Sequence, residues 1–534
     1  MALREYQQKA VQAVFNEWEQ GRNRTLLVQA TGTGKTIVLA DVVRRIVEQG
    51  GRALVMAHRS ELLDQAADKI ERTTGLKCSV EKAEETCVGS FFPVTVGSVQ
   101  TLYREKRLEK IGRNRFDLVV IDEAHHAAAE TYRRVLDFFS DAKVLGVTAT
   151  PDRKGLGDIF DSVAFEYGLA NAVRDGWLVP IEAQTIPREF DLRGARRQSG
   201  DYAAEDVASA LDPFLDQIAE EMIAAGCKEK KTVCFLPLVA TSKHFRDILE
   251  NHGFKAAEVN GSSEDRVEVL ADFDAGQYDV LCNAMLLTEG WDCPRVDCVI
   301  PLRATQSRPL YAQMVGRGTR PSPETGKTHL LLLDFLWQTE THSLVKPAQL
   351  LCSDDEVAQK MTELQEAAGG PMDLIKLEQQ ATKDVIQERE NSLAKKLQEM
   401  RTRKRKVVDP LQYAISIEAS DLVDYKPEFA WQKHAPTKPQ LDYLNRFGID
   451  TEGVLDAGMA SLLINHMSER MKMHLATPKM IRQLESRGFK RVGLWSFDDA
   501  HKMIGRIAAN NWRVPYDIDP ATYDPTSKEV AQIA

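Results

Sequence analysis

Short, almost uninterrupted apolar runs alternate with segments of helical spacing through the first two-thirds of the chain. Runs of this kind predict parallel strands that are buried on both faces of a sheet. They form two series, at 25–29, 52–57, 116–123 and 143–150, and at 231–237, 255–260, 278–284, 296–302 and 328–335. We therefore expect two α/β domains, each with a parallel sheet covered by helices, joined near residues 168–185.

The pattern changes after about residue 354. Between residues 373 and 406, apolar residues follow helical spacing in a charged background, which predicts one long amphipathic helix. This helix ends in the basic run RTRKRK at 401–406, which has two interpretations. It is either a solvated helix end or a contact with phosphate groups.

An internal repeat of 40 residues follows. The segment PTKPQLDYLNRFGI, residues 436–449, aligns with ATPKMIRQLESRGF, residues 476–489. Each unit has the pattern of a capped helix, a glycine stop, a turn and a second helix. Two helices bury little surface alone, so we expect the two units to stack on each other.

Trp495 and Trp512 lie in the second of these 40-residue repeats. Tryptophan in a small helical module belongs more often to the core, which is the interpretation we favour, and base stacking is the alternative. We expect the tail after about residue 517 to be disordered.

Composition adds few constraints to this picture. The chain has 534 residues, of which 43% are hydrophobic and 28% charged, as in ordinary folded proteins. No apolar run approaches the ~18–20 residues of a membrane span, and the N-terminal segment lacks the apolar core of a signal peptide. We therefore expect a cytoplasmic protein with no membrane partner. The net charge of −10 argues weakly against a nucleic-acid partner, but local patches decide such binding.

The eight cysteines are scattered and none forms a C-x-x-C pair. This spacing predicts reduced thiols and no structural zinc.

The stretch ATGTGKT, residues 30–36, is the first candidate for chemistry. It fits the phosphate-loop pattern G-x-x-x-x-G-K-[ST] with Ala30 in place of the first glycine, and it lies between a predicted strand and a predicted helix. Gly32 and Gly34 would let backbone N–H groups turn toward phosphates at a helix N-terminus. Lys35 would reach the β- and γ-phosphates and Thr36 would ligate Mg²⁺.

Two carboxylates end the predicted strand 116–123. Asp122 is suited to hold Mg²⁺ through its water shell, and Glu123 to orient or deprotonate an attacking water. The sequence TAT, residues 148–150, follows the next strand, and the hydroxyls of Thr148 and Thr150 could bond His125.

The second α/β domain contains QMVGRGTR, residues 313–320. Gln313, Arg317 and Arg320 are spaced so that one helical face could carry all three, and arginine suits bidentate contact with a γ-phosphate. The sequence TEGWD, residues 288–292, precedes it by one strand.

These blocks together resemble the superfamily 2 helicases and translocases of the DEAH-box type. The ordered set is LREYQQKA (3–10), ATGTGKT (30–36), AHRSELLDQ (57–65), GSVQTL (97–102), DEAH (122–125), TAT (148–150), LLTEGWDCP (286–294) and QMVGRGTR (313–320). Within the superfamily the chain looks closest to RadD-like and XPB-like DNA helicases, and it is also similar to the motor subunits of type I and III restriction enzymes. The resemblance leaves residues 350–534 uncovered, and the cysteine-rich zinc module usual in RadD-like proteins is missing from the chain.

The resemblance implies two RecA-like motor domains in tandem, with ATP and Mg²⁺ bound between them. ATP would contact Gln7, Thr31, Gly32, Thr33, Gly34, Lys35, Thr36, Asp292, Arg317 and Arg320, with Gln7 reading adenine. Catalysis would fall to Lys35, Asp122, Glu123, Gln313, Arg317 and Arg320, and coupling to His125, Thr148 and Thr150. Nucleic acid would follow His58, Arg59, Thr101 and Thr288.

The resulting domain prediction has five parts. They are an ATP-binding RecA-like domain at 1–168, a second RecA-like domain at 169–350, a helical linker at 351–410, an α-helical repeat domain at 411–516 and a tail at 517–534. The repeat domain is a candidate site for a protein partner.

The implied function is an ATP-dependent DNA helicase or translocase in DNA repair, recombination or replication. Its substrate would be single-stranded or branched DNA, with duplex DNA a further candidate. Two alternatives stay open: an RNA helicase, and an ATPase that clamps DNA and recruits a partner without unwinding it.

Overall fold

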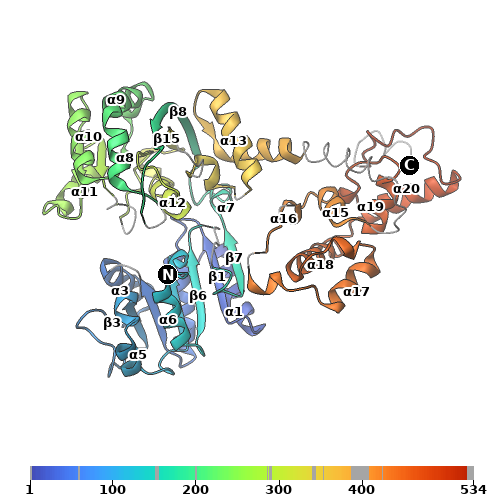
Figure 1. Cartoon of the computed structure of the whole chain (residues 1–534), viewed down its shortest axis with the longest axis horizontal. Coiled ribbons are helices and arrows are strands. Elements are labelled where there is room, and N and C mark those ends of the chain that lie inside the picture. Colours follow the sequence, from blue (N-terminus) through green and yellow to red (C-terminus); the bar gives the residue numbers. More distant parts are fainter. Residues whose placement is uncertain are drawn as a thin grey trace. The chain divides into compact units, whose positions relative to one another are not determined.

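The structure is a computed structural model of the whole chain, and the chain divides into two compact units, Met1–Ala381 and Thr382–Ala534 (Figure 1). The structure describes residues 3–57, 60–150, 156–198, 201–284, 287, 291–338, 344–352, 354–386, 408–423, 425–427 and 429–525.

A seven-stranded sheet organises the first part of unit 1, in the order β3-β4-β2-β5-β6-β1-β7. Every described strand pair in it is parallel. The strands are β1 (Arg24–Gln29), β2 (Ala53–Ala57), β3 (Cys78–Glu81), β4 (Val94–Ser98), β5 (Leu118–Asp122), β6 (Lys143–Thr148) and β7 (Ser162–Tyr167). All residues of β2 and β4 are buried, as expected for strands covered on both faces.

Helices α1 (Glu5–Glu19), α2 (Lys35–Glu48) and α3 (Ser60–Thr74) pack on this sheet. Their apolar side chains share one hydrophobic core with those of the strands, in which Val14, Val38 and Ile70 join Val55 and Val120. The remaining helices of this part are α4 (Val99–Leu102), α5 (Glu105–Ile111), η1 (Ala124–His126) and α6 (Glu130–Phe138).

A second seven-stranded sheet follows, in the order β12-β13-β11-β14-β15-β8-β16. Its described pairs are parallel except that of β16 with β8, which is antiparallel. The strands are β8 (Ile181–Asp191), β11 (Thr232–Phe235), β12 (Ala256–Val259), β13 (Val280–Asn283), β14 (Cys298–Pro301), β15 (Leu330–Gln338) and β16 (Met372–Asp373). A separate short hairpin joins β9 (Arg197–Gln198) to β10 (Asp201–Tyr202).

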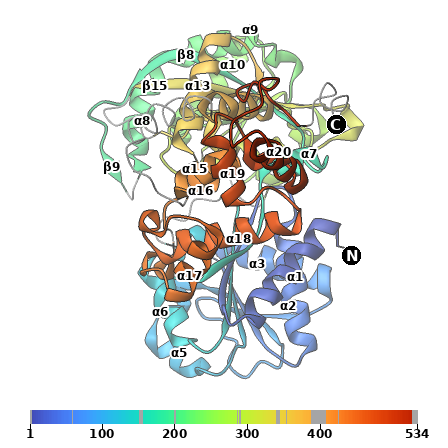
Figure 2. The ribbon, with the colours of Figure 1, turned by 90° about the vertical axis from the view of Figure 1, so that its right-hand side faces the viewer.

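Helices surround the second sheet as well. Apolar side chains of α8 (Ala204–Leu211), α9 (Leu215–Ala224) and α10 (Val239–Asn251) share a hydrophobic core with those of its strands. Figure 2 shows the two α/β parts of unit 1 from the side, blue to cyan for the first and green to yellow for the second. The other helices are α7 (Leu169–Arg174), η2 (Asp212–Phe214), η3 (Cys227–Glu229), α11 (Arg266–Ala275), α12 (Arg308–Gly316), η5 (Pro323–Thr325), η6 (Pro347–Leu350) and α13 (Asp355–Ala368).

The structure confirms two parallel-sheet α/β domains in tandem, and each of the nine predicted strands is present. The sequence pattern did not predict β3, β4, β7, β8, β9, β10 or β16. Residues 374–386 are helical, as predicted, and the rest of the predicted long helix, with RTRKRK at 401–406, lies outside the described residues.

Unit 2 is helical in its described part. Its elements are α15 (Pro410–Ser416), α16 (Ser420–Val423), η7 (Ala430–Lys433), α17 (Lys438–Phe447), η8 (Thr451–Gly453), α18 (Ala457–Lys472), α19 (Pro478–Glu485), η9 (Val492–Leu494) and α20 (Phe497–Ala509). The two repeats share one hydrophobic core, which confirms that they stack on each other.

The end of the chain departs from the prediction. Tyr523 packs against Phe489 and Trp495, with ring centroids 5.8 Å and 5.4 Å away, and Ile518 packs on the same core. The prediction of disorder from about residue 517 is therefore wrong for this packed segment, because its aromatic and aliphatic side chains cover the repeat core. Residues 526–534 lie outside the described residues.

None of the helices in the described part of the chain combines the length and apolar character that crossing a membrane requires.

Candidate nucleotide-binding site

The order of the first sheet brings three predicted motifs to neighbouring strand ends. Strands β5, β6 and β1 are adjacent and parallel, so their carboxyl ends lie at one edge. Asp122 ends β5, Thr148 ends β6, and the loop of residues 30–34 follows β1. In open parallel sheets ligands bind beyond the carboxyl ends of the strands, so this edge is the candidate site.

The loop of residues 30–34 has the shape that phosphate binding needs. Gly32 and Gly34 take left-handed φ angles of 87° and 86°, which glycine adopts without strain. Helix α2 begins directly after Gly34, and no side chain caps its N-terminus. The first N–H groups of the helix are therefore open to an anion.

Side chains behind the loop fix this shape through the carbonyl of Thr33. It accepts hydrogen bonds from Tyr6 Oη at 2.5 Å, Gln7 Nε2 at 3.2 Å and Gln29 Nε2 at 3.3 Å. The Thr33 hydroxyl donates to the Ala30 carbonyl at 2.7 Å. Tyr6 and Gln29 are not among the predicted site residues, although each is a polar side chain within or beside a recognised sequence block.

Gln7 is buried and bound within the protein. Its Oε1 accepts the Arg4 backbone N–H at 3.0 Å, while its Nε2 donates to Thr33. A Cβ on residue 34 would lie 2.7 Å from Gln7 Nε2, which is a second reason for glycine there. The structure thus brings Gln7 to the loop, and its role toward adenine stays a prediction.

The two carboxylates lie next to the loop lysine. Lys35 Nζ is 3.7 Å from Glu123 Oε1, and His125 Nδ1 is 3.4 Å from Glu123 Oε2. Burial opposes ionisation of Glu123, but Lys35 and His125 offset it and hold the pKa of that carboxyl below its usual value. Burial and the neighbouring Glu123 charge raise the pKa of Asp122.

Glu123 has a left-handed φ of 53°, which is rare for a residue with a side chain. Such backbone strain persists only where the surroundings impose it, and it is common at functional sites. Here the turn separates the directions of two successive carboxylates, so that Glu123 meets Lys35 and His125.

The predicted contact between His125 and the TAT hydroxyls is not among the hydrogen bonds of the described residues, where His125 pairs with Glu123. Thr148 and Thr150 are both buried, and the Thr150 N–H donates to Thr148 Oγ1 at 3.4 Å. The coupling roles of these residues stay predictions.

The second α/β domain reaches the loop through the segment after α12. A Cβ on Gly316 would lie 2.7 Å from Thr31 Cβ, and a Cβ on Gly32 would lie 3.5 Å from Arg320 Nε. Arg320 also pairs with Asp292, and Arg317 donates to the Trp291 carbonyl. The structure therefore brings Arg320 to the first domain's loop with Asp292 as its partner, whereas Arg317 is bound within the second domain.

The single helical face predicted for Gln313, Arg317 and Arg320 is wrong. Helix α12 ends at Gly316, so Gln313 lies within the helix while both arginines lie beyond it. Two side chains take carbonyls at this end: Thr319 Oγ1 donates to Gly316 at 3.1 Å and Lys327 Nζ donates to Gly318 at 2.6 Å. The arginines are thus positioned by a turn rather than by helical spacing.

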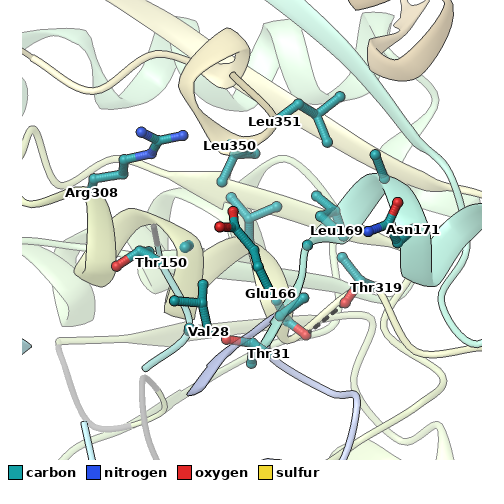
Figure 3. A pocket seen from close by; sticks show the side chains of 17 residues that line it. Val28, Thr31, Thr150, Glu166, Leu169, Asn171, Arg308, Thr319, Leu350 and Leu351 are labelled. Atoms are coloured by element: carbon teal, nitrogen blue, oxygen red, sulfur yellow. Dashed lines mark hydrogen bonds between the residues drawn. The ribbon is translucent and has the colours of Figure 1, made fainter. Parts of the chain in front are cut away.

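A cavity of about 290 Å³ lies beside the loop, between the two α/β parts of unit 1 (Figure 3). Ala30, Thr31 and Thr150 line it from the first part, and Arg308 and Thr319 line it from the second. The acidic pair and Lys35 are not part of its lining. This cavity therefore adjoins the candidate site rather than containing its reactive groups.

The residues present fit a nucleotide carrying Mg²⁺. The loop offers open N–H groups, Lys35 offers a cation, and Thr36 with Asp122 offers the oxygen ligands that Mg²⁺ prefers. The buried Thr31 hydroxyl has no hydrogen-bond partner within the described residues, so it is available to a ligand. Across the described ranges, no group of three or more His, Cys, Asp or Glu side chains is arranged to hold a metal alone.

Three of the four residues predicted to contact nucleic acid are not described by the structure. His58, Arg59 and Thr288 lie outside the described residues. Thr101 is buried, and its Oγ1 accepts the Ala83 backbone N–H at 3.2 Å. A role for Thr101 in nucleic-acid contact stays a prediction.

Comparison with known families gives two matches along the chain. Residues 1–153 match the family described as "Type III restriction enzyme, res subunit". Residues 215–322 match the "Helicase conserved C-terminal domain". The two matches fall on the two α/β parts of unit 1.

Three relatives show the extent of the similarity. The chain is 29% identical over 380 residues to "Putative ATP-dependent helicase IRC3" of Saccharomyces cerevisiae, covering 66% of this chain and 54% of that protein. It is 30% identical over 373 residues to "Putative mitochondrial ATP-dependent helicase irc3" of Schizosaccharomyces pombe, covering 67% and 61%. It is 26% identical over 379 residues to the "Type I restriction enzyme EcoAI endonuclease subunit" of Escherichia coli, covering 63% and 46%.

In each case the chain spans less than two-thirds of the relative's length. A special closeness to RadD-like and XPB-like proteins stays a prediction.

Proposed function

We propose that this chain, which belongs to the superfamily 2 helicases, hydrolyses ATP and uses the reaction to move along DNA. One observation carries the proposal: the second domain's Gly316 and Arg320 lie against the phosphate loop of the first domain, at Thr31 and Gly32. A site shared by two domains can convert nucleotide chemistry into domain motion.

The residues of the first domain prepare the γ-phosphate for attack. The open N–H groups of the loop and Lys35 bind the phosphates, and Glu123 orients the attacking water and accepts its proton. The low pKa of Glu123 keeps this carboxyl ionised at neutral pH, so it is available as an acceptor. Mg²⁺, when bound by Thr36 and Asp122, supplies Lewis-acid stabilisation of the phosphate oxygens.

The residues of the second domain make the site sensitive to the γ-phosphate. Arg320 is paired with Asp292, and a γ-phosphate between the domains would compete for the same guanidinium. Binding of ATP then favours closure and hydrolysis favours opening, because the partner of the arginine is lost with the γ-phosphate. Each cycle would shift one domain along the nucleic-acid backbone.

DNA is the proposed track. Similarity to an endonuclease subunit of a restriction enzyme supports DNA, and QMVGRGTR at 313–320 differs from the HRIGRTGR-like form of DEAD-box RNA enzymes. A grip through backbone N–H and hydroxyl groups requires no large basic face, which is compatible with a net charge of −10. Repair, recombination or replication is the proposed setting.

Movement is tested by displacement assays with ATP, in which Glu123→Gln serves as the blank. The substrates are a forked duplex, a duplex carrying a third strand, and single-stranded DNA ending in biotin–streptavidin. Displacement from any of them supports the motor. DNA-stimulated ATP hydrolysis with no displacement would instead support an ATPase that clamps DNA without moving.

Lys35→Ala is expected to lose ATP binding, because Lys35 is the cation placed beside the open loop. The measurement is the rise in thermal midpoint on adding ATP and Mg²⁺, which should be present in the wild type and absent in the variant. Lys9→Ala, a change at an exposed lysine of α1, is the control. If the thermal midpoint of Lys35→Ala rose with ATP as much as that of the wild type, Lys35 would not be the residue that binds the phosphates.

A further inference from the structure

The two repeats of unit 2 share one backbone pattern but carry different surface residues, so they can be compared position by position. Thr437 and Thr477 cap equivalent helices, and Gly448 and Gly488 end those helices with left-handed φ angles of 93° and 96°. The second helices begin at N-caps 40 residues apart, Asp456 and Ser496, each of which accepts a backbone N–H three residues on. Where the two repeats share this backbone, residues that differ between equivalent positions are not dictated by the fold.

The repeats differ in charge. Residues 436–475 contain four Lys and Arg against five Asp and Glu, a net charge of −1. Residues 476–515 contain eight Lys and Arg against three Asp and Glu, a net charge of +5. The net charge of the whole chain is −10. A local excess of positive charge favours binding of a polyanion where the basic side chains share one face.

The structures of the repeats diverge at Trp512. Helix α18 continues to Lys472, the residue equivalent to Trp512, whereas α20 ends at Ala509. Asn511 and Trp512 then take left-handed φ angles of 54° and 62°, a conformation that asparagine adopts more readily than most residues but that is unfavourable for tryptophan. The Trp512 N–H donates to the Ile507 carbonyl at 2.9 Å, so this backbone conformation is part of the packed helix end.

The Trp512 ring faces solvent beside basic side chains. The residue is 57% exposed, and the Arg487 guanidinium lies 5.8 Å from the ring centroid. Arg487 Nη1 also donates to the Gln483 carbonyl at 2.6 Å, which fixes the guanidinium near the ring. Arg513, the next residue along the chain, is exposed.

Trp495 gives the contrast. It is only 5% exposed and packs edge-on against Phe489 with ring centroids 5.6 Å apart. The core interpretation of the sequence analysis is therefore confirmed for Trp495, whereas Trp512 contributes to the surface. The exposed indole beside arginines combines the two features of sites for single-stranded nucleic acid, a stacking face and positive charge.

We propose that the surface formed by Arg487, Trp512 and Arg513, here called the Trp512 surface, binds single-stranded nucleic acid. A base stacks on the exposed indole, and the two arginines contact the flanking phosphates. Arg491 and Arg506 are not included, because they pair with Glu418 at 3.6 Å and Asp517 at 2.8 Å. This goes beyond the proposed function, because it assigns a contact outside the two motor domains.

Trp512→Lys separates stacking from charge. It installs the residue that the first repeat has at the equivalent position, and it removes the ring while adding a positive charge. Affinity of the full chain for a fluorescent oligo-dT is measured by anisotropy without nucleotide, so motor activity is not required. We expect affinity to fall about 5- to 100-fold, the range of one lost base stack, with a smaller change for blunt duplex.

Trp431→Lys is the matched control, because Trp431 is 40% exposed in the same unit but lies outside the second repeat. Its affinity should equal that of the wild type, and far-UV circular dichroism checks that each variant is folded. Arg513→Gln is the second variant, in which the slope of log affinity against log salt should fall by about 0.7, one phosphate contact.

Unchanged oligo-dT affinity in folded Trp512→Lys overturns the proposal, as does an unchanged salt slope in Arg513→Gln. An equal loss in Trp431→Lys also overturns it, because the effect would then not be specific to this surface. If Trp512→Lys lost binding to a protein partner but kept its affinity for nucleic acid, the surface would be a protein-docking site and the proposal would fail.

Discussion

Replacing Glu123 with Gln is expected to lower the ATP turnover number about 100- to 10,000-fold, the usual contribution of a general base. The amide has the shape of the carboxylate but is a much weaker proton acceptor. Lys35 and His125 approach the two carboxylate oxygens at 3.7 Å and 3.4 Å, so the side chain is already oriented in the structure. ATP binding should be retained, because the loop and Lys35 are unchanged.

Turnover is measured at saturating ATP and DNA, and binding is measured with a fluorescent ATP analogue. Glu109→Gln, a change at an exposed residue of α5, makes the same chemical substitution away from the site and should leave both values unchanged. If Glu123→Gln turned over at the wild-type rate, Glu123 would not be the base.

Arg320→Ala is the second large effect, with an expected fall in turnover of about 10³- to 10⁵-fold, the range for an arginine that stabilises phosphoryl transfer. The physical reason is position: Arg320 belongs to the second domain but lies against Gly32 of the loop in the first. Because its contact with the γ-phosphate strengthens as charge develops, the loss should fall on kcat more than on KM.

Two further variants sharpen this prediction. Arg193→Ala removes an exposed arginine of the second domain and should have no effect. Asp292→Ala removes the present partner of Arg320 and should cost less than Arg320→Ala, since the guanidinium stays available to phosphate. A loss in Arg320→Ala no larger than that in Arg193→Ala would mean that the second domain does not complete the site.

The sequence predicted those parts of the fold that follow from local pattern. Strands such as β5 and β15 consist largely of buried apolar runs, and a continuous apolar run is visible without any tertiary information. Strand β8 was missed because its sequence IEAQTIPREFD mixes charged and apolar residues, and it pairs with β15 and β16 only through contacts distant in sequence.

The site shows the same division. The glycines of the loop, Lys35 and the acidic pair were predicted because the chemistry requires those residue types at that spacing. The end of α12 was not predicted, because the hydrogen bonds that Thr319 and Lys327 donate to carbonyls there are not visible in the spacing of the residues. The different fates of Trp495 and Trp512 were likewise decided by packing, since the residue type is the same.

The central claim is that hydrolysis at the two-domain site depends on DNA. It is tested most directly by the steady-state ATP hydrolysis rate of the wild-type chain with no nucleic acid, single-stranded DNA, blunt duplex, fork, four-way junction and matched RNA, with Glu123→Gln as the blank. The account predicts stimulation by single-stranded or branched DNA and none by RNA. Stimulation by RNA alone, or the same rate with and without every nucleic acid, would contradict it.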